Sequence, residues 1–96
     1  MTDRDQERLR LDLYLKRSGL VKRRSLAATL CENGYVTLNG RSAGPGKAVK
    51  VGDRIQIRYA RKELLVVITG IPPGKQVRKG EGYRVLDEQQ IEEELF

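Results

Sequence analysis

Three consecutive cations, Lys22, Arg23 and Arg24, stand directly before Ser25, which the local pattern predicts as the N-cap of a short helix. The first N–H groups of a helix have no intrahelical partner, and the helix N-terminus carries about half a positive charge. Cations at this end cost up to about 1 kcal/mol each, unless an anion docks beside them. The stretch therefore predicts a site whose chemistry is the binding of an anion.

Cations also dominate the surrounding segment. Residues 8–24 contain seven Lys or Arg side chains against a single acid, Asp12. Two amphipathic helices that present such unmixed charge on one side predict a contiguous binding patch, although lysines and arginines also serve simply to solvate helices. The seven cations are Arg8, Arg10, Lys16, Arg17, Lys22, Arg23 and Arg24.

Asp12 has two interpretations. It is either the N-cap of the first helix or a carboxylate that orients Arg23 or Arg24 toward a phosphate. We favour the N-cap, because capping is the commoner role of Asp at the start of a helix.

The charge of the whole chain identifies the class of partner. The 96 residues include 19 Lys or Arg and 13 Asp or Glu, a net charge of +6, and the five acids of residues 87–96 stand without a base. A basic body with an acidic tail favours nucleic acid over an anionic membrane surface as the partner. The alternative is a protein that has a high pI without binding either. No apolar run reaches the length of a membrane span and the N-terminus is charged, so we expect a cytoplasmic protein that does not bind membranes.

The single cysteine, Cys31, cannot form an intramolecular disulfide, and the chain has no His to act as a base or metal ligand. We expect Cys31 to be a small apolar residue on the buried face of the second helix. The sequence predicts no cofactor, no metal and no catalytic residue.

Apolar spacing predicts the elements that position the cations. Leu11, Tyr14 and Leu15 indicate a first helix that stops at Gly19. A second helix is expected over about 24–33, with Gly34 as its stop. Its predicted apolar face consists of Leu26, Ala27, Leu30 and Cys31.

After Gly34 the apolar period changes to two, which predicts strands. Asn39-Gly40 predicts a type I′ hairpin turn, and Gly52-Asp53 predicts another turn before alternating core residues at 55, 57 and 59. The letters "RKE" at 61–63 indicate a hairpin loop, and "LLVVITGI" a central or best-covered strand.

The predicted organisation is an α+β fold: two short N-terminal helices packed on a small, mainly antiparallel sheet. Residues 1–7 are expected to be disordered, 8–71 to form the domain, 72–82 a flexible connector, and 83–96 a C-terminal docking segment. Within that segment, 83–86 form a last strand or a docking stretch. Asp87 and Gln90 have capping-box spacing, which predicts a short acidic helix.

Five motifs in order give residues 8–57 a family resemblance. They are the RLDxxL opening at Arg10–Leu15, the basic run before Ser25, the Gly34 stop, "VTLNG" at 36–40 and "KVGD" at 50–53. The stretch resembles the ribosomal protein S-four RNA-binding domain, also called the alpha-L motif. The resemblance implies an L-shaped pair of helices against a sheet, with RNA held between the helices and the first hairpin.

The resemblance also implies which residues contact RNA. The charge pattern adds Arg17 to the RNA-contact residues that the resemblance implies. Asn39 has the alternative role of a pure turn former, and Lys47 that of a solvated loop residue. The RNA-contact residues that the resemblance implies are Arg10, Lys16, Lys22, Arg23, Arg24, Ser25, Asn39 and Lys47.

The five aromatic residues are scattered, with Tyr14 and Tyr59 expected in the core, so no stacking platform for single strands is predicted and structured RNA is favoured. The 39 residues after Ile57 lack a catalytic cluster, which predicts a binding protein and not an enzyme. Standalone relatives of this kind are the heat-shock protein fifteen and RqcP families, and the short chain with "YRVLDEQQ" is more similar to the latter. The implied function is binding to stalled large subunits that carry peptidyl-tRNA in ribosome-associated quality control.

The implied partners are large-subunit rRNA, tRNA, the large ribosomal subunit and a quality-control tailing factor, with a monomer off the ribosome. The alternatives are a heat-shock-protein-fifteen-like rescue factor, a detached RNA-targeting domain of an RNA-modifying enzyme, and a protein-interaction adaptor.

Overall fold

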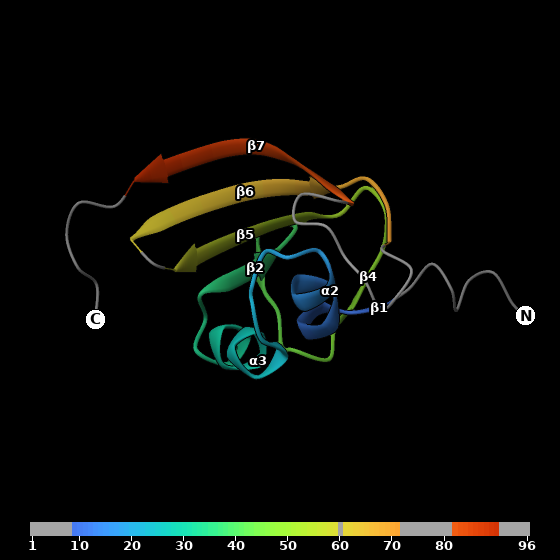
Figure 1. Ribbon diagram of the computed structural model, residues 1–96, viewed down its shortest axis with the longest axis vertical. Coiled ribbons are helices and arrows are strands. Elements are labelled where there is room, and N and C mark those ends of the chain that lie inside the picture. Colours follow the sequence, from blue (N-terminus) through green and yellow to red (C-terminus); the bar gives the residue numbers. More distant parts are fainter. Residues whose placement is uncertain (1–8, 60, 72–81, 91–96) are drawn as a thin grey trace, which may run out of the picture.

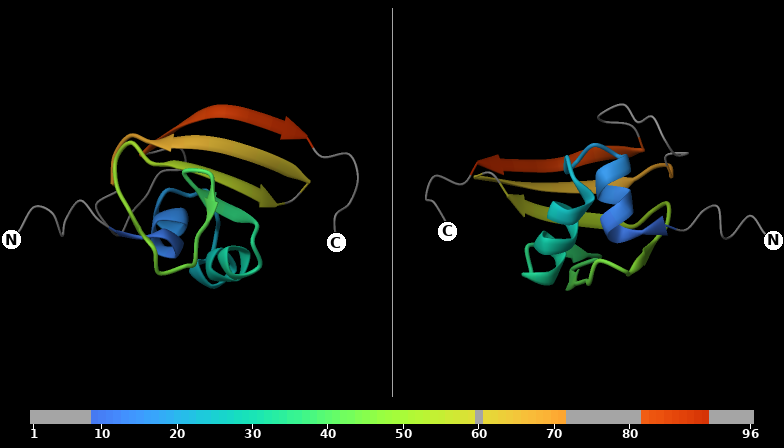
Figure 2. Two further views of the ribbon diagram at one scale, coloured as in Figure 1. Left: turned by 180° about the vertical axis from the view of Figure 1, so that it is seen from behind. Right: turned by 60° about the horizontal axis from the view of Figure 1, so that its bottom comes forward.

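The computed structural model describes residues 9–59, 61–71 and 82–90. In this part of the chain two helices pack against one face of an antiparallel sheet, as Figure 1 and the right-hand view of Figure 2 show. The α+β architecture predicted from the sequence is confirmed. The segments predicted as a disordered N-terminus and a flexible connector lie outside the described residues, apart from Gly82.

The first helix, α2 (Leu11–Arg17), follows directly on a two-residue strand, β1 (Leu9–Arg10). Its N-cap is Arg10, which makes no side-chain cap, and Asp12 lies in the first turn. The prediction that Asp12 is the N-cap is therefore wrong, because β1 pairs with β4 (Ala48–Val49) and brings the chain into the helix two residues earlier.

The second helix, α3 (Arg24–Glu32), has Arg23 at its N-cap position without a side-chain hydrogen bond. Ser25 lies inside the first turn, so its predicted capping role is wrong. Both predicted helix stops are confirmed, since Gly19 and Gly34 each have φ of +83°, a conformation that favours glycine.

The main sheet has the order β3-β2-β5-β6-β7, with every pair antiparallel. The β2–β3 turn consists of Asn39 (φ +53°) and Gly40 (φ +86°), which confirms the type I′ prediction. The strands of this sheet are β2 (Val36–Leu38), β3 (Arg41–Ser42), β5 (Arg54–Tyr59), β6 (Lys62–Ile68) and β7 (Tyr83–Gln90).

The hairpin between β5 and β6 is tighter than predicted. Tyr59 pairs with Lys62, so Lys62 and Glu63 belong to β6 and not to a loop. The strand predicted as central, β6, is internal, while β5 occupies the middle of the order.

The predicted acidic helix at Asp87–Gln90 is wrong, because these residues continue β7. Asp87 pairs with Leu65 and Glu88 with Leu64. A ladder to a neighbouring strand satisfies the backbone polar groups of these residues, which an isolated short helix does only marginally. The strand alternative for 83–86 is confirmed, and residues 91–96 lie outside the described part of the chain.

The core lies between the helices and the inner face of the sheet. Alternate residues of β5 and β6, among them Ile55, Ile57, Leu64 and Val66, are buried there. Leu26 is 43% exposed, so its predicted place on the apolar face of α3 is wrong.

Two tyrosines link the helical part to the sheet. Tyr14 is fully buried and its hydroxyl donates to the carbonyl of Gly82 at 2.7 Å, whereas Tyr59 is partly buried and donates to the carbonyl of Leu20. Cys31 is buried, as predicted, and burial raises the pKa of its thiol to about 11. Among the described residues, no helix has the length and apolar character needed to cross a membrane.

Candidate RNA-binding face

A buried carboxylate gathers two of the predicted cations. Asp12 is 3% exposed, and its oxygens accept hydrogen bonds from Nε and Nη2 of Arg10 at 3.2 and 3.1 Å. Nε of Arg24 lies 3.4 Å from Oδ2 of the same carboxylate. The side chains of both arginines are about half exposed, so each has one edge on Asp12 and presents another to solvent.

The electrostatics of Asp12 agree with this geometry. Burial alone raises the pKa of the carboxyl, but the hydrogen bond from Arg10, the Leu13 N–H and the charges of Arg24 and Arg10 together hold it below its usual value. Asp12 is thus ionised at neutral pH. The structure supports the orienting role of Asp12, directed at Arg24 and Arg10 and not at Arg23.

The start of α3 forms an exposed basic surface. Lys22, Arg23, Arg24 and Ser25 are all exposed, and Lys22 and Arg23 form no ion pair with any described residue. A shallow hollow beside them includes the exposed Leu26. The surface therefore offers unpaired cations, a helix N-terminus and one apolar side chain within a single turn.

Thr29 completes that hollow from the next turn of α3. Its hydroxyl donates to the Ser25 carbonyl at 3.0 Å, and Thr29 is itself exposed. The hollow therefore has a mixed polar and apolar lining.

Lys16 and Arg17 occupy the last turn of α2, where cations complement the negative end of the helix dipole. Lys16 is exposed and Arg17 is half-buried. Neither takes part in the Asp12 cluster.

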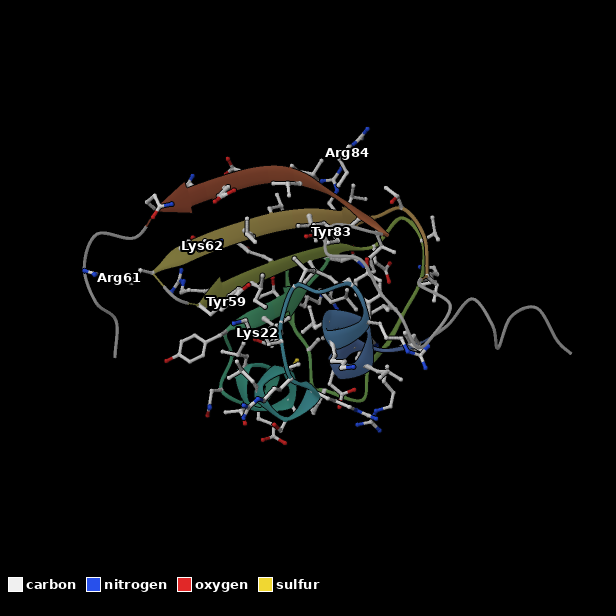
Figure 3. The ribbon with its side chains drawn as sticks, in the orientation of Figure 1. Lys22, Tyr59, Arg61, Lys62, Tyr83 and Arg84 are labelled. Atoms are coloured by element: carbon white, nitrogen blue, oxygen red, sulfur yellow. The ribbon has the colours of Figure 1, made fainter. Side chains whose placement is uncertain are left out.

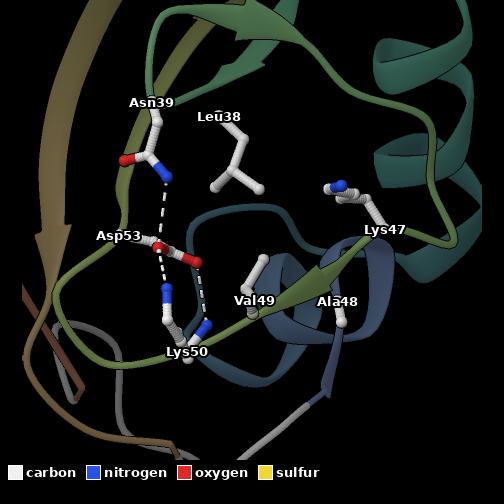
Figure 4. A pocket seen from close by; sticks show the side chains of 7 residues that line it. All are labelled: Leu38, Asn39, Lys47, Ala48, Val49, Lys50 and Asp53. Carbon is white, nitrogen blue, oxygen red and sulfur yellow. Dashed lines mark hydrogen bonds and ion pairs between the residues drawn. The ribbon is translucent and has the colours of Figure 1, made fainter.

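Asn39 is exposed, but both ends of its side-chain amide form hydrogen bonds within the protein. Its Nδ2 donates to Oδ1 of Asp53 at 3.1 Å, and its Oδ1 accepts from the Arg54 N–H at 2.9 Å. Asp53 is buried and also accepts hydrogen bonds from the N–H and Nζ of Lys50, as Figure 4 shows. These hydrogen bonds connect the turn of the first hairpin to the turn before β5.

The electrostatics of Asp53 mirror those of Asp12. Burial raises the pKa of Asp53, but the hydrogen bonds from Asn39 and Lys50 outweigh that effect and lower it overall. The sequence feature that indicates the Lys50–Asp53 interaction is the "KVGD" spacing, which places a Lys and an Asp three residues apart across a glycine turn.

Lys47 is exposed and lines a second hollow, together with Asn39 and Asp53 (Figure 4). Its backbone lies close to α2. Its carbonyl accepts from the Leu11 N–H at 2.8 Å, and the Pro45 carbonyl accepts from the Asp12 N–H at 3.0 Å. The loop before β4 therefore satisfies two of the free N–H groups at the start of α2.

Gly46 is a site residue that sequence reasoning missed. A Cβ placed on it would lie 3.5 Å from Nη1 of Arg10. The loop thus runs beside the guanidinium that Asp12 holds, with room there for a small residue, and no short-range sequence signal marks this proximity.

Comparison with known proteins identifies the family. Residues 9–55, which span both helices and the first hairpin, match the S4 domain. The RQC P-site tRNA stabilizing factor of Halalkalibacterium halodurans is 44% identical over 86 residues, covering 86% of this chain and 96% of that protein. This chain belongs to the RQC P-site tRNA stabilizing factor family.

Further relatives support this assignment. The RQC P-site tRNA stabilizing factor of Bacillus subtilis is 33% identical, over 88% of this chain and 100% of that protein. Among solved structures, the trimeric Heat Shock Protein 15 of Vibrio cholerae matches with a TM-score of 0.73 and 35% identity, covering 82% of each chain. The predicted resemblance to an S-four domain protein close to both families is confirmed, and so is the prediction of a non-enzymatic RNA-binding factor.

Proposed function

We propose that this RQC P-site tRNA stabilizing factor homologue binds structured RNA of the large ribosomal subunit and a P-site tRNA through the face built around Asp12 and the start of α3. The observation that carries the proposal is that Asp12 holds Arg10 and Arg24, which come from different elements, beside the exposed cations at 22 and 23.

The chemistry of this face suits phosphate groups in a fixed arrangement. A guanidinium that is already hydrogen-bonded along one edge loses little freedom when its other edge binds a phosphate oxygen. The N–H groups of α3 and the adjacent cations add attraction for the same anion. We assign contact with RNA to Arg10, Lys16, Arg17, Lys22, Arg23, Arg24, Ser25 and Lys47.

Asn39 has a different role in this proposal. Because both ends of its amide are occupied, we assign it to shaping the first hairpin and not to direct contact. Structured RNA is favoured over single strands because Tyr14 and Tyr59 use their hydroxyls within the protein and lie against the core.

The cellular setting follows from the proposed partner. A factor that holds tRNA on large subunits works in the cytoplasm, where a quality-control tailing factor is a candidate neighbour. The structural match to Heat Shock Protein 15 keeps a related ribosome-rescue function as the second candidate.

The proposal is tested on purified large subunits that carry peptidyl-tRNA. We expect the wild-type chain to co-sediment with them, and we expect Arg24→Ala and Lys22→Ala to reduce the bound fraction. Arg54→Ala is the matched control, because Arg54 is also exposed but its neighbour Ile55 is buried, so it lies on the sheet face away from the helices.

Two outcomes decide against the proposal. Absence of wild-type protein from the large-subunit fraction at low salt would remove the ribosomal partner. An equal loss in Arg54→Ala and Arg24→Ala would show that net charge, and not this face, determines binding.

A further inference from the structure

The last strand leaves one edge of the sheet open. β7 pairs with β6 on one side, and no described strand pairs with its other side. Residues 83–90 contain neither Pro nor Lys, two of the residues that commonly protect a free edge. Val85 and Leu86 are 45% and 41% exposed on this strand.

A β-bulge changes which residues of β7 share a face. Val66 pairs with Val85 and Leu65 with Asp87, so Leu86 has no partner of its own in β6. Because of this extra residue, Arg84, which pairs with Val67, lies on the same face as Asp87. Residues three apart in a regular strand would point to opposite faces.

Arg84 and Asp87 project from the free strand without an ion pair to each other or to another described residue. Figure 3 shows Arg84 extending from the edge of β7 away from the helices, whereas Tyr83 lies on the side of the sheet that faces them. Asp87 accepts only a hydrogen bond from Gln89 within the described residues. Two opposite charges therefore stand on one face of an open strand.

We propose that β7 pairs antiparallel with β7 of a second copy of this chain, with Arg84 opposite Asp87. Two-fold symmetry then forms this ion pair twice and places Val85 opposite Leu86 between the two pairs. The same register places Tyr83 opposite Glu88. Within one copy, Tyr83 pairs with Ile68 of β6 and Glu88 pairs with Leu64. Because Ile68 and Leu64 are both buried, Tyr83 and Glu88 both lie on the inner face of the sheet.

The bulge is what makes this register possible. A two-fold axis perpendicular to the sheet needs each paired residue to lie on the same face as its partner, and a regular strand meets that condition only for residues an even number apart. The extra residue at Leu86 shifts the alternation, so Arg84 and Asp87 satisfy it. The result is one continuous sheet with the helices of both copies on the same side.

The proposed pairing leaves the RNA-binding face accessible. α2 and α3 cover the β2 and β5 part of the sheet, and β7 lies two strands beyond β5 (Figures 1 and 2). The pairing departs from the monomer expected from the sequence. It is independent of the proposed RNA function, because it uses no residue of the Asp12 cluster or of the start of α3.

Sedimentation velocity of the full chain, without RNA, tests the proposal. Because a single strand pair buries little area, we expect a weak dimer that is populated at about 0.5 mM chain and dissociates on dilution. Arg84→Glu and Asp87→Arg should each abolish it by placing like charges opposite each other. The double variant Arg84→Glu with Asp87→Arg should restore it, because the exchange recreates both ion pairs.

Arg41→Glu is the matched control, an equal charge reversal at an exposed residue of β3, the strand at the opposite edge of the sheet, that should leave the dimer intact. A wild-type chain that remains monomeric at this concentration overturns the proposal. A dimer that survives both single reversals, or that the double variant fails to restore, also overturns it, because self-association would then use another surface.

Discussion

Oδ2 of Asp12 lies 3.4 Å from Nε of Arg24, so a buried carboxylate in the first turn of α2 holds the cation at the first residue of α3. The same carboxylate binds Arg10 in β1. The Asp12 carboxylate thereby joins β1, α2 and α3. The proposed RNA-binding face depends on this negative charge as much as on the cations.

Asp12→Asn is expected to weaken RNA binding although it raises the net charge of the protein. The neutral amide no longer attracts Arg10 and Arg24, so both guanidinium groups lose their fixed positions and affinity falls by about 1 kcal/mol, or about fivefold. Stability should fall by roughly 1 to 3 kcal/mol, as for a buried hydrogen-bonded group that loses its partners. Filter binding and chemical denaturation measure the two effects, and tighter RNA binding by this variant would refute the orienting role.

Arg24→Ala should weaken RNA binding by about 1 to 3 kcal/mol and lower the slope of log affinity against log salt by about one unit. We expect the melting temperature to change little. Removing a cation from a helix start is favourable, but the loss of the contact with Asp12 opposes that gain. Arg24→Lys should recover only part of the affinity, since an ammonium cannot bind two acceptors in a fork.

Leu26→Ser tests whether the exposed leucine contributes an apolar contact to the RNA. Because Leu26 is not in the core, the melting temperature should remain near that of the wild type. RNA affinity should fall by about 1 kcal/mol with an unchanged salt slope, since no phosphate contact is lost. Leu30→Ser is the contrasting variant on the same helix: Leu30 is buried, and its replacement should lower stability sharply.

Asn39→Ala separates the turn role of Asn39 from RNA contact. Alanine at φ of +53° is strained, and the variant also loses the hydrogen bonds to Asp53 and the Arg54 N–H, so we expect destabilisation of about 1 to 3 kcal/mol. The RNA affinity of the folded fraction should stay unchanged. A selective loss of affinity with unchanged stability would assign Asn39 to the RNA contact instead.

Acidification should destabilise the fold through Asp12 and Asp53. Folding lowers the pKa of both carboxyls, so their contribution is complete above the ordinary Asp pKa of about 3.9 and is lost as the pH falls through their lower folded-state values. Melting temperatures should therefore decline below about pH 4. In the double variant Asp12→Asn with Asp53→Asn the decline should be smaller, and an equal decline would assign the acid sensitivity to other groups.

Features that depend on a few neighbouring residues were predictable from the sequence. Gly19 and Gly34 end their helices, and Asn39-Gly40 forms the type I′ turn, because each needs a backbone conformation that only certain residues adopt at low cost. The cations before α3 were also visible as a charge run, and their exposure follows from their polarity. The family resemblance rested on these same local motifs.

The remaining features depend on contacts between distant segments. Asp12 does not cap its own helix, because the pairing of β1 with β4 sets where α2 begins and Arg24 arrives from the next helix. The residues with capping-box spacing at Asp87 form a strand and not a helix, because they pair with β6 through backbone hydrogen bonds. Leu26 is exposed because the packing of α3 on α2, and not hydropathy, decides which face of a short helix is covered. Local conformational preference is encoded residue by residue, whereas burial and ion pairing are settled only when the elements meet.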